Sequence, residues 1–157
     1  MNKRLSWDEY FMGLALMAAK RSADPSTQVG CVIVKNDNSI ASLGYNGFPR
    51  NTKNGDFNWI GKGEWINTKY PYVVHAEMNA LLSAKGIDLT NCKVYVTLAP
   101  CNECAKAMVQ AGIKEVVYYN DKHKDMDVFR AGKIILKKAG IACKPYQMKN
   151  IEVKIKL

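Results

Sequence analysis

From His75 onward, the sequence alternates regularly between helical segments and short apolar strands. Apolar residues at helical spacing or in short runs predict helices over 75–85, 101–110 and 127–139, and strands over 94–98, 115–119 and 143–146. Because strands that are separated by helices pair in parallel, this half of the chain predicts an α/β sheet with helices packed on it.

The first half begins with a capping box, in which Ser6 precedes Glu9 by three residues. A helix is predicted over 7–21, followed by strands over 29–34 and 40–45 that form a hairpin. Taken with the second half, the order of elements is α-β-β-α-β-α-β-α-β. The last residues, 151–157, alternate between apolar and polar side chains as an edge strand does.

Residues 46–71 interrupt this order. The stretch is rich in glycine and asparagine, and its apolar residues follow neither helical nor strand spacing. A loop of this length inside a compact domain is usually functional or partly disordered. Several large apolar side chains argue against free disorder, namely Phe48, Phe57, Trp59, Trp65 and Ile66. They predict a loop that packs on the domain or on a neighbouring subunit.

The bulk properties of the chain are those of an ordinary globular protein. Its 157 residues fit a single domain, 1–157, with one core. No apolar run approaches the roughly 20 residues that span a bilayer, and the N-terminus lacks the apolar segment of a secretory signal. A cytoplasmic protein with no membrane partner is therefore expected, or a nucleocytoplasmic one if the host has a nucleus. Its five cysteines, an odd number, argue against a disulfide framework. The net charge of +9 favours anionic partners, although the dispersed lysines equally fit a solvated surface.

Two short motifs, each at the start of a predicted helix, bring together residues that bind metals. His75 and Glu77 open one helix, and Cys101 and Cys104 open another directly after Pro100. The two cysteines are three residues apart and share a helix face, where the helix N-terminus favours thiolates. Because helix N-termini meet at the carboxyl ends of the strands in an α/β sheet, the two motifs are predicted to form one site.

Two thiolates and one imidazole match zinc, and only three protein ligands, His75, Cys101 and Cys104, are evident. A structural zinc ion normally has four protein ligands, so this set predicts a position open to water, which zinc activates near neutral pH. Glu77 is expected to move protons from that water to the ring nitrogen and the leaving ammonia. His-x-Glu followed by Pro-Cys-x-x-Cys is the signature of zinc nucleobase deaminases.

A structural zinc site is the competing interpretation, in which the chain is a zinc-stabilised interaction domain without activity. Its fourth ligand would come from Cys31, Cys92, Cys143 or His123, none of which lies next to either motif. The three cysteines fall in or beside predicted strands and are expected to be small core residues. A structural site also leaves Glu77 without a role.

These residues resemble the cytidine deaminase superfamily and, within it, the deoxycytidylate (dCMP) deaminase family. The zinc motif alone indicates the superfamily, whereas the long loop that leads through Lys69-Tyr70-Pro71-Tyr72 to His75 points to the dCMP branch. The resemblance covers nearly the whole chain and is carried by residues 7–12, 28–31, 44–49, 70–80, 100–106 and 110–116.

The resemblance implies a three-layer α-β-α fold with a five-stranded mixed sheet flanked by helices. It implies hydrolysis of dCMP to dUMP and ammonia, which supplies dUMP for thymidylate synthesis. Family members commonly form homohexamers, and many are activated by dCTP and inhibited by dTTP, with Mg²⁺ accompanying the triphosphates. Some members bind a second zinc ion through extra Cys and His residues, but 23–25 and 47–72 contain neither residue, so one catalytic zinc ion per chain is expected.

The same resemblance assigns two further substrate contacts. Asn46 matches an asparagine that contacts the sugar, and its amide can both donate to and accept from a hydroxyl. Lys122 matches a position at the rim of the site and is expected to contact the phosphate. A turn-forming role for Asn46 and a solvated side chain for Lys122 are the structural alternatives.

Two groups of residues are assigned only by analogy with the family. Residues 26–30 match a segment that lines the base and phosphate in relatives. The predicted substrate contacts there are Ser26, Thr27, Val29 and Gly30, although a helix-ending turn explains the segment nearly as well. The candidates for a regulatory triphosphate site are Gly44, Asn79 and Lys85.

Two other substrates are consistent with the same zinc chemistry. The enzyme would act on both dCMP and dCTP if the phosphate end of the pocket were large enough. A polynucleotide deaminase, acting on cytidine in DNA or RNA or on adenosine in tRNA, needs a basic and aromatic groove for a flipped base. The long loop has Phe57, Trp59 and Trp65 but few arginines, so a nucleic-acid substrate is not expected.

Overall fold

A computed structural model describes residues 4–53 and 55–147 of the chain. Its elements, in chain order, are α1 (Trp7–Ala19), β1 (Gly30–Val34), β2 (Ile40–Tyr45), the 3₁₀ helix η1 (Trp65–Asn67), α2 (Ala76–Ser83), β3 (Lys93–Leu98), α3 (Asn102–Gln110), β4 (Glu115–Asn120), α4 (Asp127–Lys138) and β5 (Ala142–Pro145). The predicted order of elements is confirmed, and predicted boundaries differ from these by at most two residues. The strand predicted over 151–157 lies outside the described residues.

The strands form one mixed five-stranded sheet in the order β2-β1-β3-β4-β5. β1 is antiparallel to both β2 and β3, whereas β3, β4 and β5 are parallel. The hairpin of β1 and β2 and the parallel pairing in the second half are both as predicted. The capping box of α1 is also present, because Ser6 and Glu9 bond to each other's backbone amides.

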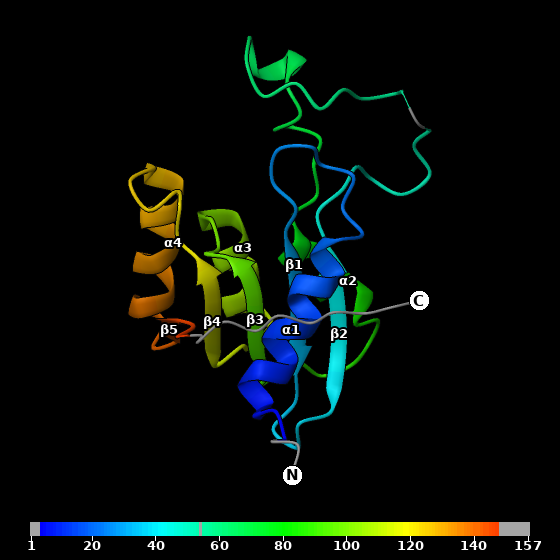
Figure 1. Ribbon diagram of the computed structural model, residues 1–157. Coiled ribbons are helices and arrows are strands. Elements are labelled where there is room, and N and C mark those ends of the chain that lie inside the picture. The colour runs from blue at the N-terminus through cyan, green and yellow to red at the C-terminus, as the bar shows by residue number, and fades with distance from the viewer. Residues whose placement is uncertain (1–3, 54, 148–157) are drawn as a thin grey trace.

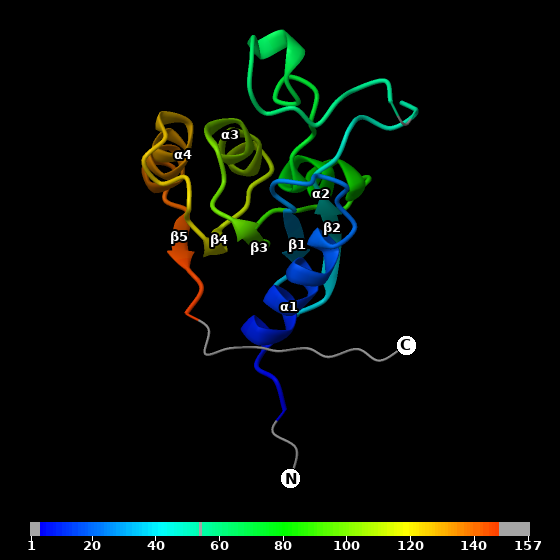
Figure 2. The same cartoon turned by 45° about the horizontal axis from the view of Figure 1, so that its top comes forward.

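Helices cover both faces of the sheet and make three layers. Of the helices in the described part of the chain, α1 covers one face, and α2, α3 and α4 lie side by side on the other, as Figures 1 and 2 show. The sheet therefore has a hydrophobic core on each face, and alternate residues of β1 belong to different cores. Val32 belongs to the core that includes Phe11 of α1, whereas Ile33 belongs to the core that includes Ala80 of α2. Burial on both faces explains why β1 is a continuous apolar run rather than an alternating one.

One edge of the sheet gathers the segments that carry the predicted functional residues. Gly30 at the start of β1 pairs with Tyr45 at the end of β2, and Leu98 near the end of β3 pairs with Asn120 at the end of β4. Because β1 runs against β3, its first residues lie beside the last residues of β3. The loops that precede β1 and follow β2, β3 and β4 therefore meet at this edge.

The described residues of the long segment, 46–53 and 55–74, extend beyond the same edge and lead back to α2 (Figure 1). A short antiparallel bridge between Gly47 and Val74 closes its base. Phe48 contacts Phe57 and Trp59, with ring centroids 5.2 and 4.1 Å apart, as packing of the loop required. Trp65 and Ile66 remain 66% and 55% exposed, so these two residues do not pack on the domain, and their packing on a neighbouring subunit stays a prediction.

The described residues include no helix that is long and apolar enough to cross a membrane.

Candidate active site

His75 is placed by the base of the long segment and by the first turn of α2. Val74 exchanges two backbone hydrogen bonds with Gly47, of 2.8 and 3.1 Å, and so holds the chain in an extended form up to His75. His75 is itself extended and caps α2, and its carbonyl accepts from the amide of Asn79 at 2.9 Å. The predicted helix therefore begins one residue later than expected, and the imidazole stands at its N-terminal end.

The two cysteines are placed by the turn from β3 into α3. The amide of Ala99 donates to the carbonyl of Asn120 at 2.8 Å, which extends the pairing of β3 and β4 beyond the strands. Cys101 caps α3, and Cys104 follows in the first turn. Both cysteines are buried, and the predicted placement of the pair at a helix start is confirmed.

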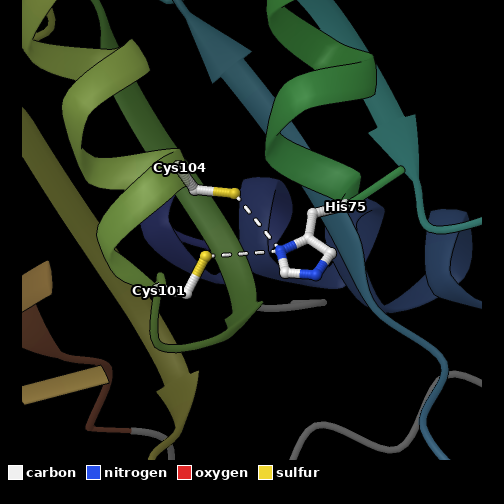
Figure 3. A group of neighbouring side chains, drawn as sticks. All are labelled: His75, Cys101 and Cys104. Carbon is white, nitrogen blue, oxygen red and sulfur yellow. Dashed lines mark hydrogen bonds between the residues drawn. The ribbon is translucent and has the colours of Figure 1, made fainter. Parts of the chain in front are cut away.

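The two helix starts bring His75, Cys101 and Cys104 into one group (Figure 3). The Nδ1 atom of His75 lies 3.4 Å from Sγ of Cys101 and 3.5 Å from Sγ of Cys104. All three ligand atoms lie within 4.8 Å of one another. Among the described residues, this is the one group of three or more His, Cys, Asp or Glu side chains that is arranged to hold a metal ion.

The geometry of this group fits a zinc ion. Ligand atoms about 2.0–2.3 Å from a tetrahedral ion are roughly 3.5 Å from each other, which is close to the two sulfur–nitrogen distances here. A structural site would need a fourth ligand, and none of the four candidates is part of the group: Cys31, Cys92, Cys143 and His123. Cys31 and Cys92 are instead buried in the core, as predicted.

The electrostatics of the three side chains favour a thiolate. Among the protein groups alone, the hydrogen bond from Cys104 and the neighbouring imidazole of His75 outweigh burial and lower the pKa of Cys101 to about 4. The hydrogen bond with Cys101 raises the pKa of His75 to about 9. The hydrogen bond with Cys101 and burial raise the pKa of Cys104, so Cys101 is the sulfur that is closer to the deprotonated form required for metal binding.

Glu77 is the buried carboxyl of the site. It is the second residue of α2 and only 4% exposed. Burial raises the pKa of Glu77 to about 7, although the charge of His75 acts in the opposite direction. The group is thus two residues from a metal ligand but outside the metal-binding group itself, which is the arrangement expected of a proton carrier.

Asn46 is also at this edge, where its amide connects two backbone segments. Its Oδ1 atom accepts from the amide of Val29 at 2.8 Å, and its Nδ2 atom donates to the carbonyl of Thr27 at 3.0 Å and to Asp24 at 3.4 Å. The residue is 5% exposed. Asn46 therefore organises the segment before β1, and its contact with the sugar remains a prediction.

Thr27 and Lys122 come together from loops that are far apart in the sequence. The Nζ atom of Lys122, from the loop after β4, donates to Oγ1 of Thr27 at 2.7 Å. Lys122 and the neighbouring Ser26 are exposed at the same rim. A cation and two hydroxyls in one place are suitable for a phosphate group, which remains a prediction for all three residues.

Gly30 and Gly44 have structural roles that sequence reasoning did not foresee. A Cβ on Gly30 would lie 1.9 Å from the carbonyl oxygen of Ala15, and a Cβ on Gly44 would lie 2.5 Å from that of Ala76. Each glycine thus lets a helix backbone rest directly on a strand. Contacts of either glycine with a nucleotide are untested.

The other two candidates for a regulatory site lie along α2. Asn79 uses its Nδ2 atom to donate to the carbonyl of Tyr45 at 2.8 Å, which ties the helix to β2. Lys85 is exposed beyond the far end of the helix, with a positive φ of 42°. Gly44 lies against the backbone of Asn79, where an added Cβ would be 2.9 Å from the carbonyl carbon, whereas Lys85 lies apart from both.

Two residues at this edge, Asp24 and Lys69, were missed by the sequence analysis. They form an ion pair of 2.6 Å beneath the segment of Ser26 and Thr27, and both side chains are buried. No role is predicted for Asp24 from the sequence, and Lys69 enters there only as part of the motif that leads to His75. No sequence pattern marks this pair, because the two residues are 45 positions apart and neither lies in an apolar run.

Residues 5–120 match the family model described as the cytidine and deoxycytidylate deaminase zinc-binding region. The chain belongs to the cytidine and deoxycytidylate deaminase family. The resemblance seen in the sequence is confirmed. The deoxycytidylate deaminase of Mus musculus is 43% identical over 152 residues, which are 96% of this chain and 85% of the mouse protein. The deoxycytidylate deaminase of Homo sapiens is 44% identical over 143 residues, covering 90% and 80% of the two chains.

A solved structure of the family has the same fold. The dCMP deaminase of cyanophage S-TIM5, in complex with dCMP and dUMP, superposes with a TM-score of 0.73 at 25% identity. The superposition covers 92% of this chain and all of the phage chain. The expected three-layer α/β fold with a five-stranded mixed sheet is therefore confirmed.

Proposed function

We propose that the chain is a zinc-dependent deaminase that converts dCMP and water to dUMP and ammonia. The observation that carries the proposal is the buried carboxyl of Glu77 beside the His75, Cys101 and Cys104 group. A purely structural metal site does not need such a carboxyl. The relatives support dCMP as the substrate, because the mouse and human proteins are deoxycytidylate deaminases and the phage enzyme was solved with dCMP and dUMP.

The residues of the chain divide the chemistry between them. His75, Cys101 and Cys104 would hold the zinc ion, which when bound would supply activation of a water molecule near neutral pH. As the water oxygen adds to C4 of cytosine, Glu77 takes the proton that the water gives up. Glu77 gives that proton to the ring nitrogen, then takes the second proton from the hydroxyl group now on C4 and gives it to the amino group. The C4–N bond breaks, ammonia leaves and the C4–O bond becomes the carbonyl of dUMP. One water is consumed, and one ammonia and one dUMP are formed.

The substrate would lie along the edge of the sheet, with its base at the metal group and its phosphate at the rim. Lys122 and Thr27 stand at that rim, and Asn46 lies between the rim and α2. Charge-assisted hydrogen bonds to a phosphate are stronger than neutral ones, so this end is expected to select nucleotides over nucleosides.

The proposal is tested with a panel of substrates and a metal count. The purified protein is incubated with dCMP, CMP, dCTP, deoxycytidine and a cytosine-containing oligonucleotide, and ammonia release is measured for each. We expect the highest kcat/KM with dCMP and one zinc ion per chain. Deamination of the oligonucleotide with no action on dCMP would overturn the choice of substrate. If none of the five compounds released ammonia, the proposal that the chain is a deaminase would be overturned.

Regulation and assembly belong to the same proposal and rest on the family resemblance. We expect activation by dCTP and inhibition by dTTP, each with Mg²⁺, in a homohexamer whose product supplies dUMP for thymidylate synthesis. The deamination rate at subsaturating dCMP tests the regulation. A rate that neither dCTP nor dTTP changes would contradict it. Sedimentation velocity tests the assembly, where a monomer at micromolar concentration is the contrary result.

A further inference from the structure

A buried ion pair joins two loops at the edge of the sheet. The Nζ atom of Lys69 lies 2.6 Å from Oδ2 and 2.8 Å from Oδ1 of Asp24. The two side chains are only 9% and 2% exposed, respectively. The same carboxylate also accepts from the amides of Ser26 and Thr27, at 2.8 and 3.1 Å, and from Nδ2 of Asn46 at 3.4 Å. Asp24 is thus the common acceptor for the segment that carries the candidate substrate contacts.

Lys69 occupies an equally central place in the long segment. Its amide donates to the carbonyl of Ile60 at 2.8 Å, and its carbonyl accepts from Tyr72 and Val73 at 3.1 and 3.0 Å. The next residue after these two is Val74, which pairs with Gly47 and leads directly into His75. The ion pair therefore links the chain that delivers a metal ligand to the chain that carries the substrate contacts.

Stability alone is a poor explanation for this pair. Removing two charges from water is costly, and uncharged side chains of similar volume often stabilise a protein as well as a buried ion pair does. Two hydrogen bonds from one lysine to both oxygens of an aspartate do, however, define one geometry for both loops. Apolar replacements would keep the loops together without fixing their register.

We propose that Asp24 and Lys69 are positioning residues, whose ion pair sets the segment of Ser26, Thr27 and Asn46 against the segment that leads to His75. This inference rests on the proposed deamination of dCMP. Metal binding does not depend on the pair, because His75 is also held by the Gly47–Val74 bridge and by α2. The substrate segment, by contrast, is bonded to Asp24 itself, which accepts from the amides of Ser26 and Thr27, so loss of the pair is expected to affect substrate binding first.

The test compares the parent protein with Lys69→Met, Asp24→Asn and the double variant. Each single variant leaves one buried group without its charged partner and is expected to unfold at a lower urea concentration. The double variant removes both charges and is expected to recover most of the parental urea midpoint and a full zinc content. Its KM for dCMP is expected to remain at least about 10-fold above the parental value. A double variant with parental stability and parental KM would overturn the inference.

Hydrogen exchange provides a second measurement that does not depend on activity. Peptides covering 22–30 and 60–74 are expected to exchange faster in the double variant, or in Asp24→Asn if the double variant does not fold, while peptides of β3 and α3 keep the parental rate. Parental exchange in both loops would also overturn the inference. If the parent itself releases no ammonia from dCMP, the proposed function fails, and the exchange experiment still decides whether the pair holds the loops in place.

The exposed pair of Asp127 and Arg130 provides the matched control. Its atoms are 3.1 Å apart, but the side chains of Arg130 and Asp127 are 64% and 92% exposed. The corresponding double variant, Asp127→Asn with Arg130→Met, is expected to leave KM, zinc content and loop exchange unchanged. An equal rise in KM in this control would show that removal of any ion pair has the same effect and would overturn the specific role of Asp24 and Lys69.

Discussion

Gly132 of α4 lies directly against the backbone of Cys101. A Cβ on Gly132 would lie 2.5 Å from the carbonyl oxygen of Pro100 and 2.9 Å from the carbonyl carbon of Cys101. Both distances are far below van der Waals contact, and both neighbours are backbone atoms that cannot rotate away. The helix on one side of α3 therefore supports the turn that presents the first cysteine of the metal group.

Gly132→Ala is expected to weaken both the fold and the metal site. The added methyl group forces α4 and the turn apart, which costs about 1–3 kcal/mol of unfolding free energy in a packed interior. Displacement of Cys101 is expected to lower zinc affinity about 10-fold or more, measured by competition with a chromogenic chelator. Gly13→Ala is the matched control, because a Cβ on Gly13 meets nothing within 4 Å. Undiminished zinc affinity in Gly132→Ala would contradict the prediction.

Much of this site could be predicted because its chemistry is encoded locally. The spacing of Cys101 and Cys104 and that of His75 and Glu77 follow from positions on one helix each. Alternation of helices and strands then brings the two helix starts to one sheet edge. The fold and the metal group therefore needed only short-range patterns and one topological rule.

The remaining features depend on contacts between segments that are distant in the sequence. The pairing of Asp24 with Lys69 spans 45 residues and depends on the path of a loop whose apolar residues follow no periodic pattern. The contact of Gly132 with Cys101 depends on the distance between α4 and the turn before α3, which no hydrophobic pattern encodes. The carboxylate of Asp24 could not be predicted as an organising group, because its partners come from three separate segments.

Lys122→Ala is expected to affect nucleotides more than nucleosides. The Nζ atom of Lys122 is held at the rim by Thr27, where it is expected to meet the phosphate of dCMP. Loss of one charge-assisted hydrogen bond of about 1.5 kcal/mol raises the KM for dCMP roughly 10-fold. The KM for deoxycytidine, which has no phosphate, should stay unchanged. Lys124→Ala, an exposed neighbour, is the control, and equal effects on both substrates would contradict a phosphate contact.

Asp8→Asn is expected to destabilise the fold in a manner that depends on pH. Asp8 accepts hydrogen bonds from Tyr95 and from Lys93, the latter at 3.0 Å. Burial raises the pKa of Asp8, but these two donors outweigh it and hold the pKa below the usual 3.8. Because the folded pKa is the lower one, the stabilisation is complete above about pH 4 and is lost as the pH falls through the folded value.

Urea unfolding of the parent and of Asp8→Asn at pH 7, 5, 4 and 3 measures this effect. The metal-free forms of both proteins are compared, so that loss of zinc in acid does not contribute. The difference in unfolding free energy should be largest at pH 7 and 5 and should shrink toward pH 3. A difference that stays constant over this range would show that the charge of Asp8 is not the stabilising feature.

Glu77→Gln separates proton transfer from metal binding. Glutamine has nearly the shape of glutamate and preserves a buried polar group, but it cannot carry a proton between water and cytosine. General acid–base catalysis contributes about 10²- to 10⁴-fold, so kcat for dCMP should fall by at least that range. The zinc content and the urea midpoint should remain close to the parental values, because Glu77 is not part of the metal-binding group. A Glu77→Gln protein with full activity would show that another group carries the proton, and one that lost its zinc would show that Glu77 supports the metal instead.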